Sequence, residues 1–300
     1  MIEILNVSKK FDTTLAVNNV SATIDEANVF GMVGTNGAGK STLIRMIAGV
    51  LKPDAGQILI DGEDVYENEN AKKKMFYISD EQFFFPGASV EDMRKFYADI
   101  YEDFDNDRFN MLLDKLGLNS KRTIATFSKG MKKQLSVILG ICSNTKYLLC
   151  DETFDGLDPV VRQAVKKLFI GELESRKMTP IIASHNLREL EDVCDHVGLL
   201  HKGGILFSKD MDDMKLNIHR IQCVFSSDED RKTFEESEDI VTSDSRGSMY
   251  MYTVRGSEDE LIESIAKVNT IFAEVLPLSL EEIFITETEV VGYDIKNIIE

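Results

Sequence analysis

Residues 34–41 read Gly-Thr-Asn-Gly-Ala-Gly-Lys-Ser, which matches in full the phosphate-binding pattern G-x-x-x-x-G-K-[ST]. The three glycines allow backbone conformations and close approaches that a Cβ atom would forbid, so successive N–H groups can surround an anion. Lys40 supplies positive charge for the outer phosphates of a nucleotide, and the hydroxyl of Ser41 can ligate Mg²⁺. The stretch therefore predicts a site for a nucleoside triphosphate and its magnesium ion.

The sequence on both sides of this loop supplies the strand and the helix that such a loop requires. Residues 28–33 form a short buried-strand pattern, and residues 42–48 are apolar at helical spacing. The positive end of that helix would face the phosphates. The alternative, a glycine-rich turn with an incidental Lys-Ser pair, does not account for this setting. We expect the nucleotide to contact Gly34, Thr35, Asn36, Gly37, Ala38, Gly39, Lys40, Ser41 and Thr42.

Composition limits the possible classes of protein. The chain has 300 residues, of which 43% are hydrophobic, so it suits one large α/β domain with a smaller one. It carries 34 basic and 52 acidic residues, a formal net charge of −18. Residues 221–300 hold 19 of the acidic and only 6 of the basic side chains. This acidic balance argues against a nucleic-acid partner, and an ordinary solvated face explains it well.

The cysteines and the apolar runs indicate a cytoplasmic protein. None of the cysteines forms a C-x-x-C pair, and a reduced protein fits better than a disulfide framework. No targeting signature opens the sequence, and no apolar run approaches the roughly 20 residues that span a bilayer. We expect any membrane process to be served through a partner, with the chain peripheral on the inner face of the membrane.

A second part of the site follows a buried-strand pattern further along the chain. The apolar residues 147–150 are followed by Asp151 and Glu152. Ligands of open α/β sheets bind at the carboxyl ends of the strands, where these acids would lie. Asp151 would hold Mg²⁺, directly or through water, and Glu152 would polarise the attacking water. Many strands simply end in acids, but the preceding phosphate loop favours the functional interpretation.

Residues 151–159, Asp-Glu-Thr-Phe-Asp-Gly-Leu-Asp-Pro, resemble the segment from the Walker B strand to the D-loop in ABC transporter ATP-binding subunits. The resemblance covers residues 2–217 and extends to Phe11, where the family stacks adenine. It also includes residues 127–131, which are similar to the signature loop, and His185, similar to the switch histidine. It implies a P-loop NTPase fold of the ABC ATPase type, ATP and Mg²⁺ as cofactors, catalytic roles for Lys40, Glu152 and His185, and nucleotide contacts from Ser128 and Gly130.

Each of these residues also has a plainer interpretation. Ser128 stands at a helix start, where it could be an ordinary N-cap, although the same end of a helix can bind an anion. A single histidine such as His185 is more often a structural residue, but its place after a sheet strand favours a contact with the γ-phosphate. Phe11 could be a core aromatic. Asp158 and Pro159 fit a helix N-cap and N1, which is compatible with a D-loop.

Two departures from the family pattern stand out. The alignment puts Asp80 where the family usually has a glutamine, and Gln82 lies two residues later. Asp80 could still ligate Mg²⁺ or a bridging water, so either residue could serve in the Q-loop. The signature reads Ser-Lys-Gly-Met, which resembles bacterial ABC-2-type exporters rather than nutrient importers.

Residues 88–142 are rich in helical patterning, with helices expected over 90–101, 107–116 and 129–141. They match the helical subdomain that the family inserts between the two nucleotide-binding motifs. Before them, Phe83, Phe84 and Phe85 cannot all face one core, so at least one is expected at the surface. The family grips its membrane subunit in this region. Packing inside the subdomain is the alternative role.

The first domain is expected to end at residue 217 and a second, at 218–300, to form a small acidic α+β domain. Strand-like segments are 221–225, 248–254 and 271–275, and helix-like ones are 227–236 and 259–268. Residues 278–284 are modestly similar to the closing motif of exporter-type subunits. No catalytic constellation is visible in this domain, and its role stays open.

The resemblance implies an ATP-hydrolysing subunit of a bacterial ABC-2-type transporter, and we expect that transporter to export its substrate. One chain carries one phosphate loop and one signature loop, so two subunits would sandwich two ATP molecules head to tail, as a homodimer or a heterodimer. A separately encoded transmembrane permease would be the other partner. The alternative is a soluble or regulatory ABC ATPase, including one acting on ribosomes or DNA. The single cassette and the negative charge argue against the last of these.

Overall fold

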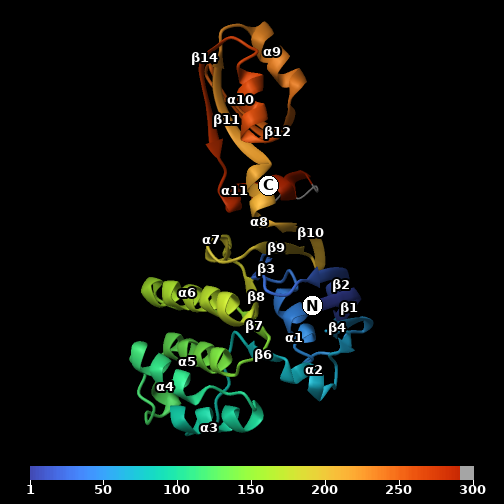
Figure 1. The fold of residues 1–300 in the computed structure, drawn as a ribbon. Coiled ribbons are helices and arrows are strands. Elements are labelled where there is room, and N and C mark those ends of the chain that lie inside the picture. The colour runs from blue at the N-terminus through green and yellow to red at the C-terminus, as the bar shows by residue number, and fades with distance from the viewer. Residues whose placement is uncertain (291–300) are drawn as a thin grey trace. The chain divides into compact units, whose positions relative to one another are not determined.

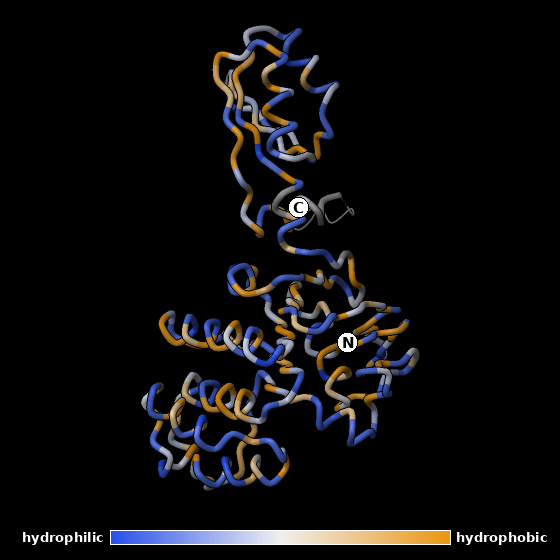
Figure 2. Tube along the Cα trace, viewed as in Figure 1, coloured by the Kyte–Doolittle hydropathy of each residue, from blue (hydrophilic) through white to orange (hydrophobic). Residues whose placement is uncertain are grey.

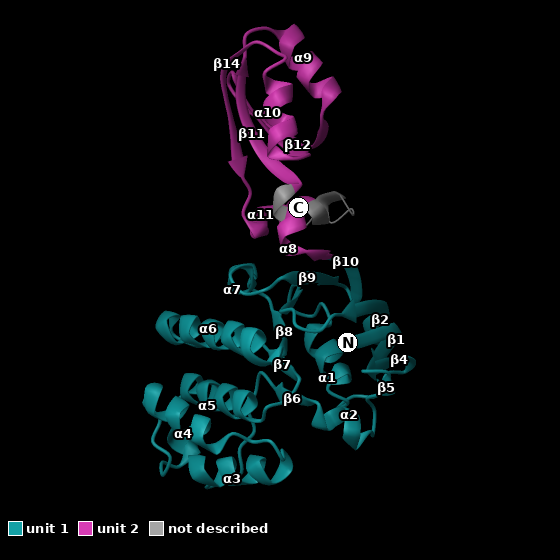
Figure 3. Cartoon of the chain, in the orientation of Figure 1, with its two compact units in different colours: residues 1–208 teal, residues 209–300 magenta. Residues whose placement is uncertain are grey.

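A computed structural model describes residues 1–290 of the chain (Figure 1). The chain divides into two compact units, Met1–Ser208 and Lys209–Glu300 (Figure 3). The division falls inside strand β10 (Gly204–Asp210), earlier than the expected boundary at residue 217. The reason is that helix α8 (Met211–Leu216) contacts β11 and α11 of the second unit.

The first unit contains an antiparallel sheet near its amino terminus. Its strand order is β2 (Thr14–Ile24), β1 (Ile2–Phe11), β4 (Ala55–Ile60) and β5 (Glu63–Asp64). Ile2 and Ile4 on β1 are buried and oppose Ile60 and Ile58 on β4, as the two-residue period of a half-buried strand requires. This face joins the main hydrophobic core.

The second sheet of the first unit positions the site. Its order is β10, β9 (His196–His201), β3 (Phe30–Val33), β8 (Thr179–Ser184), β7 (Tyr147–Asp151) and β6 (Met75–Ile78). Strands β9, β3, β8, β7 and β6 run parallel. Every residue of β3, β7 and β8 is buried, which is typical of a parallel sheet covered on both faces. The carboxyl ends of the parallel strands β3, β6, β7 and β8 therefore bring four loops to one edge.

Helices complete the first unit, and Figure 2 shows apolar and polar residues alternating along them. Helix α1 (Lys40–Ile47) contacts β2, β7 and β8, so it lies between the two sheets. The inserted helices are α3 (Val90–Ile100), α4 (Asn106–Lys115) and α5 (Lys129–Cys142), within one residue of the expected bounds. The remaining helices are α2 (Glu69–Lys73), η1 (Ile124–Thr126), α6 (Pro159–Arg176) and α7 (Leu187–Glu191).

The helix starts follow from their capping residues. Ser89 and Asp92 form a reciprocal capping box at the start of α3. The carboxylate of Asp158 accepts hydrogen bonds from the N–H groups of Val160 and Val161, with Pro159 in the first turn. The expected N-cap at Asp158 is therefore present.

The second unit is a four-stranded antiparallel sheet with helices α9 and α10 between its strands, and with α8 before the first strand and α11 after the last. Its chain order is β11 (Ile218–Phe225), α9 (Asp228–Ser237), β12 (Asp239–Arg246), β13 (Met249–Arg255), α10 (Glu258–Ile265), β14 (Thr270–Pro277) and α11 (Leu280–Val290). The order in space, β12-β13-β11-β14, is that of a ferredoxin-like βαββαβ unit. Its core includes Phe234, Tyr252 and Leu261.

Strand β12 is the strand of this unit that the sequence did not predict, and helices α8 and α11 were not predicted either. It reads Asp-Ile-Val-Thr-Ser-Asp-Ser-Arg, with few apolar residues to mark a buried face. It is a strand because its main chain pairs with β13, and its composition alone does not predict that pairing. Within residues 1–290, no helix combines the length and the hydropathy needed to cross a membrane.

Candidate nucleotide site

The phosphate loop joins β3 to α1, and two of its glycines are required by their surroundings. Gly39 has φ +103°, and a Cβ atom there would lie 2.4 Å from the carbonyl oxygen of Ala16. At Gly34 a Cβ atom would lie 2.4 Å from the carbonyl oxygen of Leu200. Both contacts are with main chain, which cannot rotate away. The loop is therefore held against the β1–β2 turn region and the end of β9.

The loop opens into a cavity of about 590 Å³, a size suited to a small ligand. Nine of the predicted site residues line it: Asn36, Gly37, Ala38, Gly39, Lys40, Ser41, Thr42, Asp80 and Glu152. Gly34 and Thr35 are not among the described residues that line the cavity. Their carbonyl groups accept hydrogen bonds from Lys40, which does line it. Predicted residues from three separate segments thus meet at one place.

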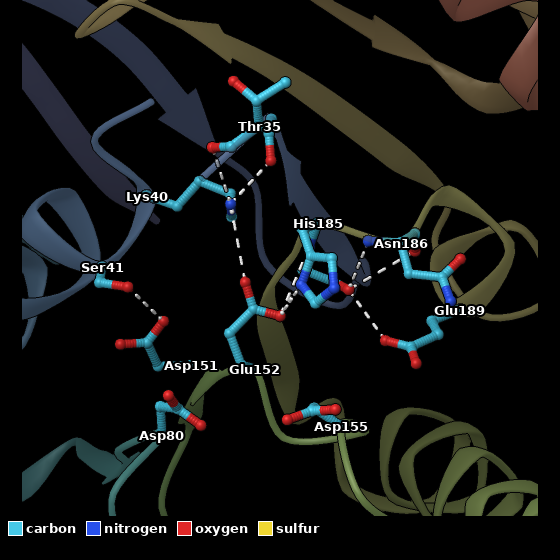
Figure 4. Close-up of polar contacts among 12 residues, drawn as sticks. Thr35, Lys40, Ser41, Asp80, Asp151, Glu152, Asp155, His185, Asn186 and Glu189 are labelled. Atoms are coloured by element: carbon cyan, nitrogen blue, oxygen red, sulfur yellow. Dashed lines mark hydrogen bonds and ion pairs between the residues drawn. The ribbon is translucent and has the colours of Figure 1, made fainter. Parts of the chain in front are cut away.

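Lys40 is almost fully buried at the start of α1. Its ammonium donates to the carbonyl oxygens of Gly34 at 2.7 Å and Thr35 at 3.3 Å, and lies 3.6 Å from Oε1 of Glu152 (Figure 4). Burial lowers the pKa of Lys40, while the nearby Glu152 carboxylate opposes that shift. A phosphate group would supply a further negative partner for this charge.

Ser41 and Asp151 form the oxygen pair expected for a magnesium site. The hydroxyl of Ser41 donates to Oδ1 of Asp151 at 2.9 Å, and that carboxylate is fully buried at the end of β7. Burial raises the pKa of Asp151, so a bound cation would compensate a charge that the protein holds at a cost. Residues 1–290 contain no group of three or more His, Cys, Asp or Glu side chains placed to hold a metal. The donor set fits Mg²⁺ bound mainly through phosphates and water.

Glu152 has an unusual backbone for a glutamate. Its φ is +48°, in the left-handed region, and its N–H donates to the carbonyl oxygen of Ala183 on β8 at 2.9 Å. Its Oε2 lies 2.9 Å from Nδ1 of His185 and accepts from the His185 main-chain N–H at 3.4 Å (Figure 4). The carboxylate thus stands between Lys40 and His185. Backbone strain of this kind is often found at functional sites.

Asp80, rather than Gln82, faces the cavity. The amide of Gln82 is turned back on its own loop, where it donates to the carbonyl oxygens of Ser79 at 2.9 Å and Asp80 at 2.8 Å. The carboxylate of Asp80 lies 3.3 Å from the ammonium of Lys133 on α5. Asp80 also raises the pKa of Asp151 by charge repulsion, after the larger effect of burial.

The signature loop lies at the start of α5, apart from the cavity. Ser128 is exposed and caps α5 by accepting a hydrogen bond from the N–H of Met131 at 3.2 Å. A Cβ atom at Gly130 would lie 3.0 Å from the carbonyl oxygen of Gly156, so this end of the helix packs closely on the 152–158 loop. The described residues that line the cavity include neither Ser128 nor Gly130.

Phe11 ends β1 and is 45% exposed. The ammonium of Lys9 lies 5.7 Å from the centre of its ring. The described residues that line the cavity do not include Phe11, although its cross-strand partner Thr14 does line it. Adenine stacking by Phe11 stays a prediction.

Sequence reasoning missed four lining residues: Thr14, Leu15, Ala16 and Lys202. Lys202 lies in the turn between β9 and β10, whose Gly203 donates its N–H to the carbonyl oxygen of Ala38. The Lys-Gly-Gly sequence at 202–204 signals a turn, but nothing in it signals a nucleotide. Its lysine adds positive charge at the edge of the cavity.

The fold and the site together define a P-loop ATPase with an inserted helical subdomain. Comparison with known proteins then identifies the family. The chain belongs to the ABC transporter family of ATP-binding proteins, whose "ABC transporter" domain model matches residues 17–155. The chain is an ATP-binding, ATP-hydrolysing transporter subunit, which confirms the predicted fold class and enzyme class.

Individual relatives support this assignment. The ABC transporter ATP-binding protein YtrB of Bacillus subtilis (strain 168) is 29% identical over 287 residues, covering 96% of this chain and 98% of YtrB. The lantibiotic transport ATP-binding protein SrtF of Streptococcus pyogenes is 30% identical over 214 residues, 71% of this chain and 92% of SrtF. A solved ATP-binding subunit of an ABC transporter has a TM-score of 0.66 at 25% identity, covering 72% and 92% of the two chains.

Proposed function

We propose that this chain powers a bacterial ABC-2-type exporter by ATP-dependent head-to-tail pairing of two copies. The observation that carries the proposal is the division of the predicted site. The phosphate loop, Asp80 and Glu152 line one cavity, whereas Ser128 is exposed on a different part of the same unit. A second copy would bring its Ser128 loop to the nucleotide held by the first.

Within each half-site the residues take complementary roles. Lys40 neutralises charge on the outer phosphates, and His185 contacts the γ-phosphate through its ring. Glu152 orients and polarises the attacking water, since its carboxylate already lies between the Lys40 ammonium and the His185 ring. Ser41, Asp151 and Asp80 hold Mg²⁺, which supplies electrostatic stabilisation of the phosphate oxygens when bound. Phe11 and the rest of the loop position the nucleotide.

An exposed aromatic surface supports a permease partner. Phe83, Phe85 and Phe96, which we call the aromatic surface, stack edge to face with centroid distances of 6.0 and 4.9 Å. Phe83 is 73% exposed, more than either neighbouring phenylalanine. Clustered exposed aromatics are typical of protein interfaces. The permease would hold the chain at the inner face of the membrane.

Export as the direction of transport rests on the relatives. Besides SrtF, the bacitracin transport ATP-binding protein BcrA of Bacillus licheniformis is 29% identical over 218 residues, 72% of this chain and 71% of BcrA. These two relatives are named for bacitracin transport and for lantibiotic transport. The Ser-Lys-Gly-Met signature fits the same group.

The variant Glu152→Gln tests the proposal. It keeps the shape of the side chain but removes the charge that polarises water, so ATP should bind while turnover falls at least about a hundredfold. Size-exclusion chromatography with Mg-ATP should then show a stable dimer, which the wild type loses as it hydrolyses. The exposed Glu81→Gln is the control. Wild-type turnover by Glu152→Gln, or a monomer that stays monomeric with ATP, would contradict the proposal.

A further inference from the structure

Lys133 on α5 is a fully buried lysine with two partners in the catalytic region. Its exposed fraction is 0%. Its ammonium lies 3.3 Å from Oδ1 of Asp80 and donates a short hydrogen bond to the main-chain carbonyl oxygen of Glu152. One side chain thus connects the inserted helical subdomain, the loop after β6 and the loop after β7.

Burying an ammonium group is expensive, because the desolvation cost is several kcal/mol unless good partners replace water. The other lysines at this end of α5 avoid that cost. Lys129 is exposed and pairs with Asp155 at 3.1 Å, and Lys132 is half-buried. An apolar residue at position 133 would fill the same space without a charge. A lysine at this position is therefore explained by the two groups that its ammonium contacts, the Asp80 carboxylate and the Glu152 carbonyl oxygen.

Lys133 contacts Glu152 at a residue whose backbone conformation is strained. With φ at +48°, Glu152 needs support from its surroundings, and hydrogen bonds to its peptide groups provide it. Its N–H donates to Ala183 on β8. Its carbonyl oxygen accepts from the N–H of Asp155 in its own loop at 3.2 Å and from Lys133, the partner that comes from α5. The direction of its side chain follows from this backbone conformation. That direction places the carboxylate at 3.6 Å from Lys40 and 2.9 Å from His185.

We propose that Lys133 is a positioning residue that makes the orientation of the Glu152 carboxylate depend on the position of α5, with Asp80 balancing its charge. Helix α5 begins directly after Ser128, and five residues at about 1.5 Å each separate Ser128 from Lys133. A movement of α5 caused by docking of a second copy on Ser128 would therefore reach Lys133 through about one and a half helical turns. Lys133 would pass it to Glu152, the residue proposed to orient the water. This inference rests on the proposed role of Glu152.

Two substitutions separate the hydrogen bond from the charge. Lys133→Met removes both, whereas Lys133→Gln keeps an N–H donor without the charge, on a side chain one bond shorter. If the donated hydrogen bond positions Glu152, kcat should fall at least about tenfold in Lys133→Met. The kcat of Lys133→Gln should then be at least about fivefold higher than that of Lys133→Met. The dissociation constant for ATP, measured by titration calorimetry, should stay within about threefold in both. Lys132→Met, the same change one residue away, should keep wild-type values.

The double variant Asp80→Asn/Lys133→Met tests a purely structural role. Because Asp80 is itself a proposed Mg²⁺ ligand, the double variant is compared with Asp80→Asn alone. If Lys133 only neutralised Asp80, these two variants would have the same kcat. The proposal instead expects kcat to be at least about fivefold lower in the double variant than in Asp80→Asn. If Lys133→Met does not fold, as judged by urea unfolding, this comparison replaces the one with Lys133→Gln.

The outcomes separate this inference from the proposed function. Equal kcat in Lys133→Met and Lys133→Gln, or equal kcat in the double variant and Asp80→Asn, would overturn the role of Lys133. An inactive Glu152→Gln would in that case leave the proposed function intact. Turnover by Glu152→Gln in the same assay would overturn the proposed function itself.

Discussion

Nδ1 of His185 lies 2.9 Å from Oε2 of Glu152, and the other oxygen of that carboxylate lies 3.6 Å from the ammonium of Lys40. A single carboxylate therefore bridges the group after β8 and the lysine of the phosphate loop. Because the two contacts use different oxygens, each restrains a different rotation of the side chain. The orientation of Glu152 depends on both partners.

Loss of the His185 ring should therefore affect turnover more than binding. His185→Ala leaves the phosphate loop intact but frees one oxygen of Glu152 and removes the contact to the γ-phosphate. We expect kcat to fall roughly tenfold to a hundredfold, with the ATP dissociation constant within about threefold. Steady-state kinetics and calorimetry provide the two numbers. His196→Ala is the control, because that ring contacts Phe30 and Ser208 instead. Unchanged kcat in His185→Ala would rule out the role.

Asp151→Asn should stabilise the nucleotide-free protein while weakening its response to magnesium. Burial raises the pKa of Asp151 above 3.8, so the native state holds its proton more tightly than the unfolded state does. The ionised carboxylate thus lowers the free energy of unfolding at pH above the raised pKa, and this cost disappears as pH falls below 3.8. Asparagine can still accept the hydrogen bond of Ser41.

We therefore expect Asp151→Asn to raise the Tm at pH 8 by a few degrees, and to raise it less as the pH is lowered toward 3.8. Adding Mg-ATP should raise the Tm of the variant less than that of the wild type. Calorimetry across this pH range, with and without Mg-ATP, gives the comparison. A lower Tm at pH 8 would show that the charge stabilises the fold and that the sign is wrong.

The two positive-φ glycines of the phosphate loop should differ in their tolerance of alanine. Gly37 has φ +81° and open space around a Cβ atom, so Gly37→Ala should cost only the backbone strain, roughly 1–2 kcal/mol. Gly39→Ala adds a clash with the carbonyl of Ala16 and should cost at least about 3 kcal/mol. Urea unfolding measures both, and ATP affinity should fall in the same order. Equal costs would mean that the loop can move away from Ala16.

The aromatic surface should be required for transport but not for basal hydrolysis. The sequence predicted at least one of Phe83, Phe84 and Phe85 at the surface, and Phe83 and Phe85 are exposed. Phe83→Ser/Phe85→Ser removes apolar contact area without touching the cavity, so basal ATPase activity should stay within about twofold while permease binding falls at least tenfold. Val50→Ser, at another exposed apolar residue, is the control. Intact transport in vesicles by the double variant would exclude docking at this surface.

Local patterns in the sequence were sufficient for the parts of the site that are contiguous. The loop at 34–41 specifies its own conformation, because its glycines and the strand and helix around it are all neighbours in the chain. The acids after β7, the histidine after β8 and the capped helices were predictable for the same reason: each depends on a few adjacent residues. The family and the ATPase class followed from the order of these motifs.

Tertiary structure decided what depends on residues far apart in the chain. The cavity wall at Thr14–Ala16 and Lys202, the choice of Asp80 over Gln82 and the burial of Lys133 arise from packing between separate segments. The same holds for β12, whose weakly apolar sequence becomes a strand only through its pairing with β13. Hydrogen bonds and desolvation across such contacts outweigh local preference, and no pattern within a short stretch of sequence encodes them.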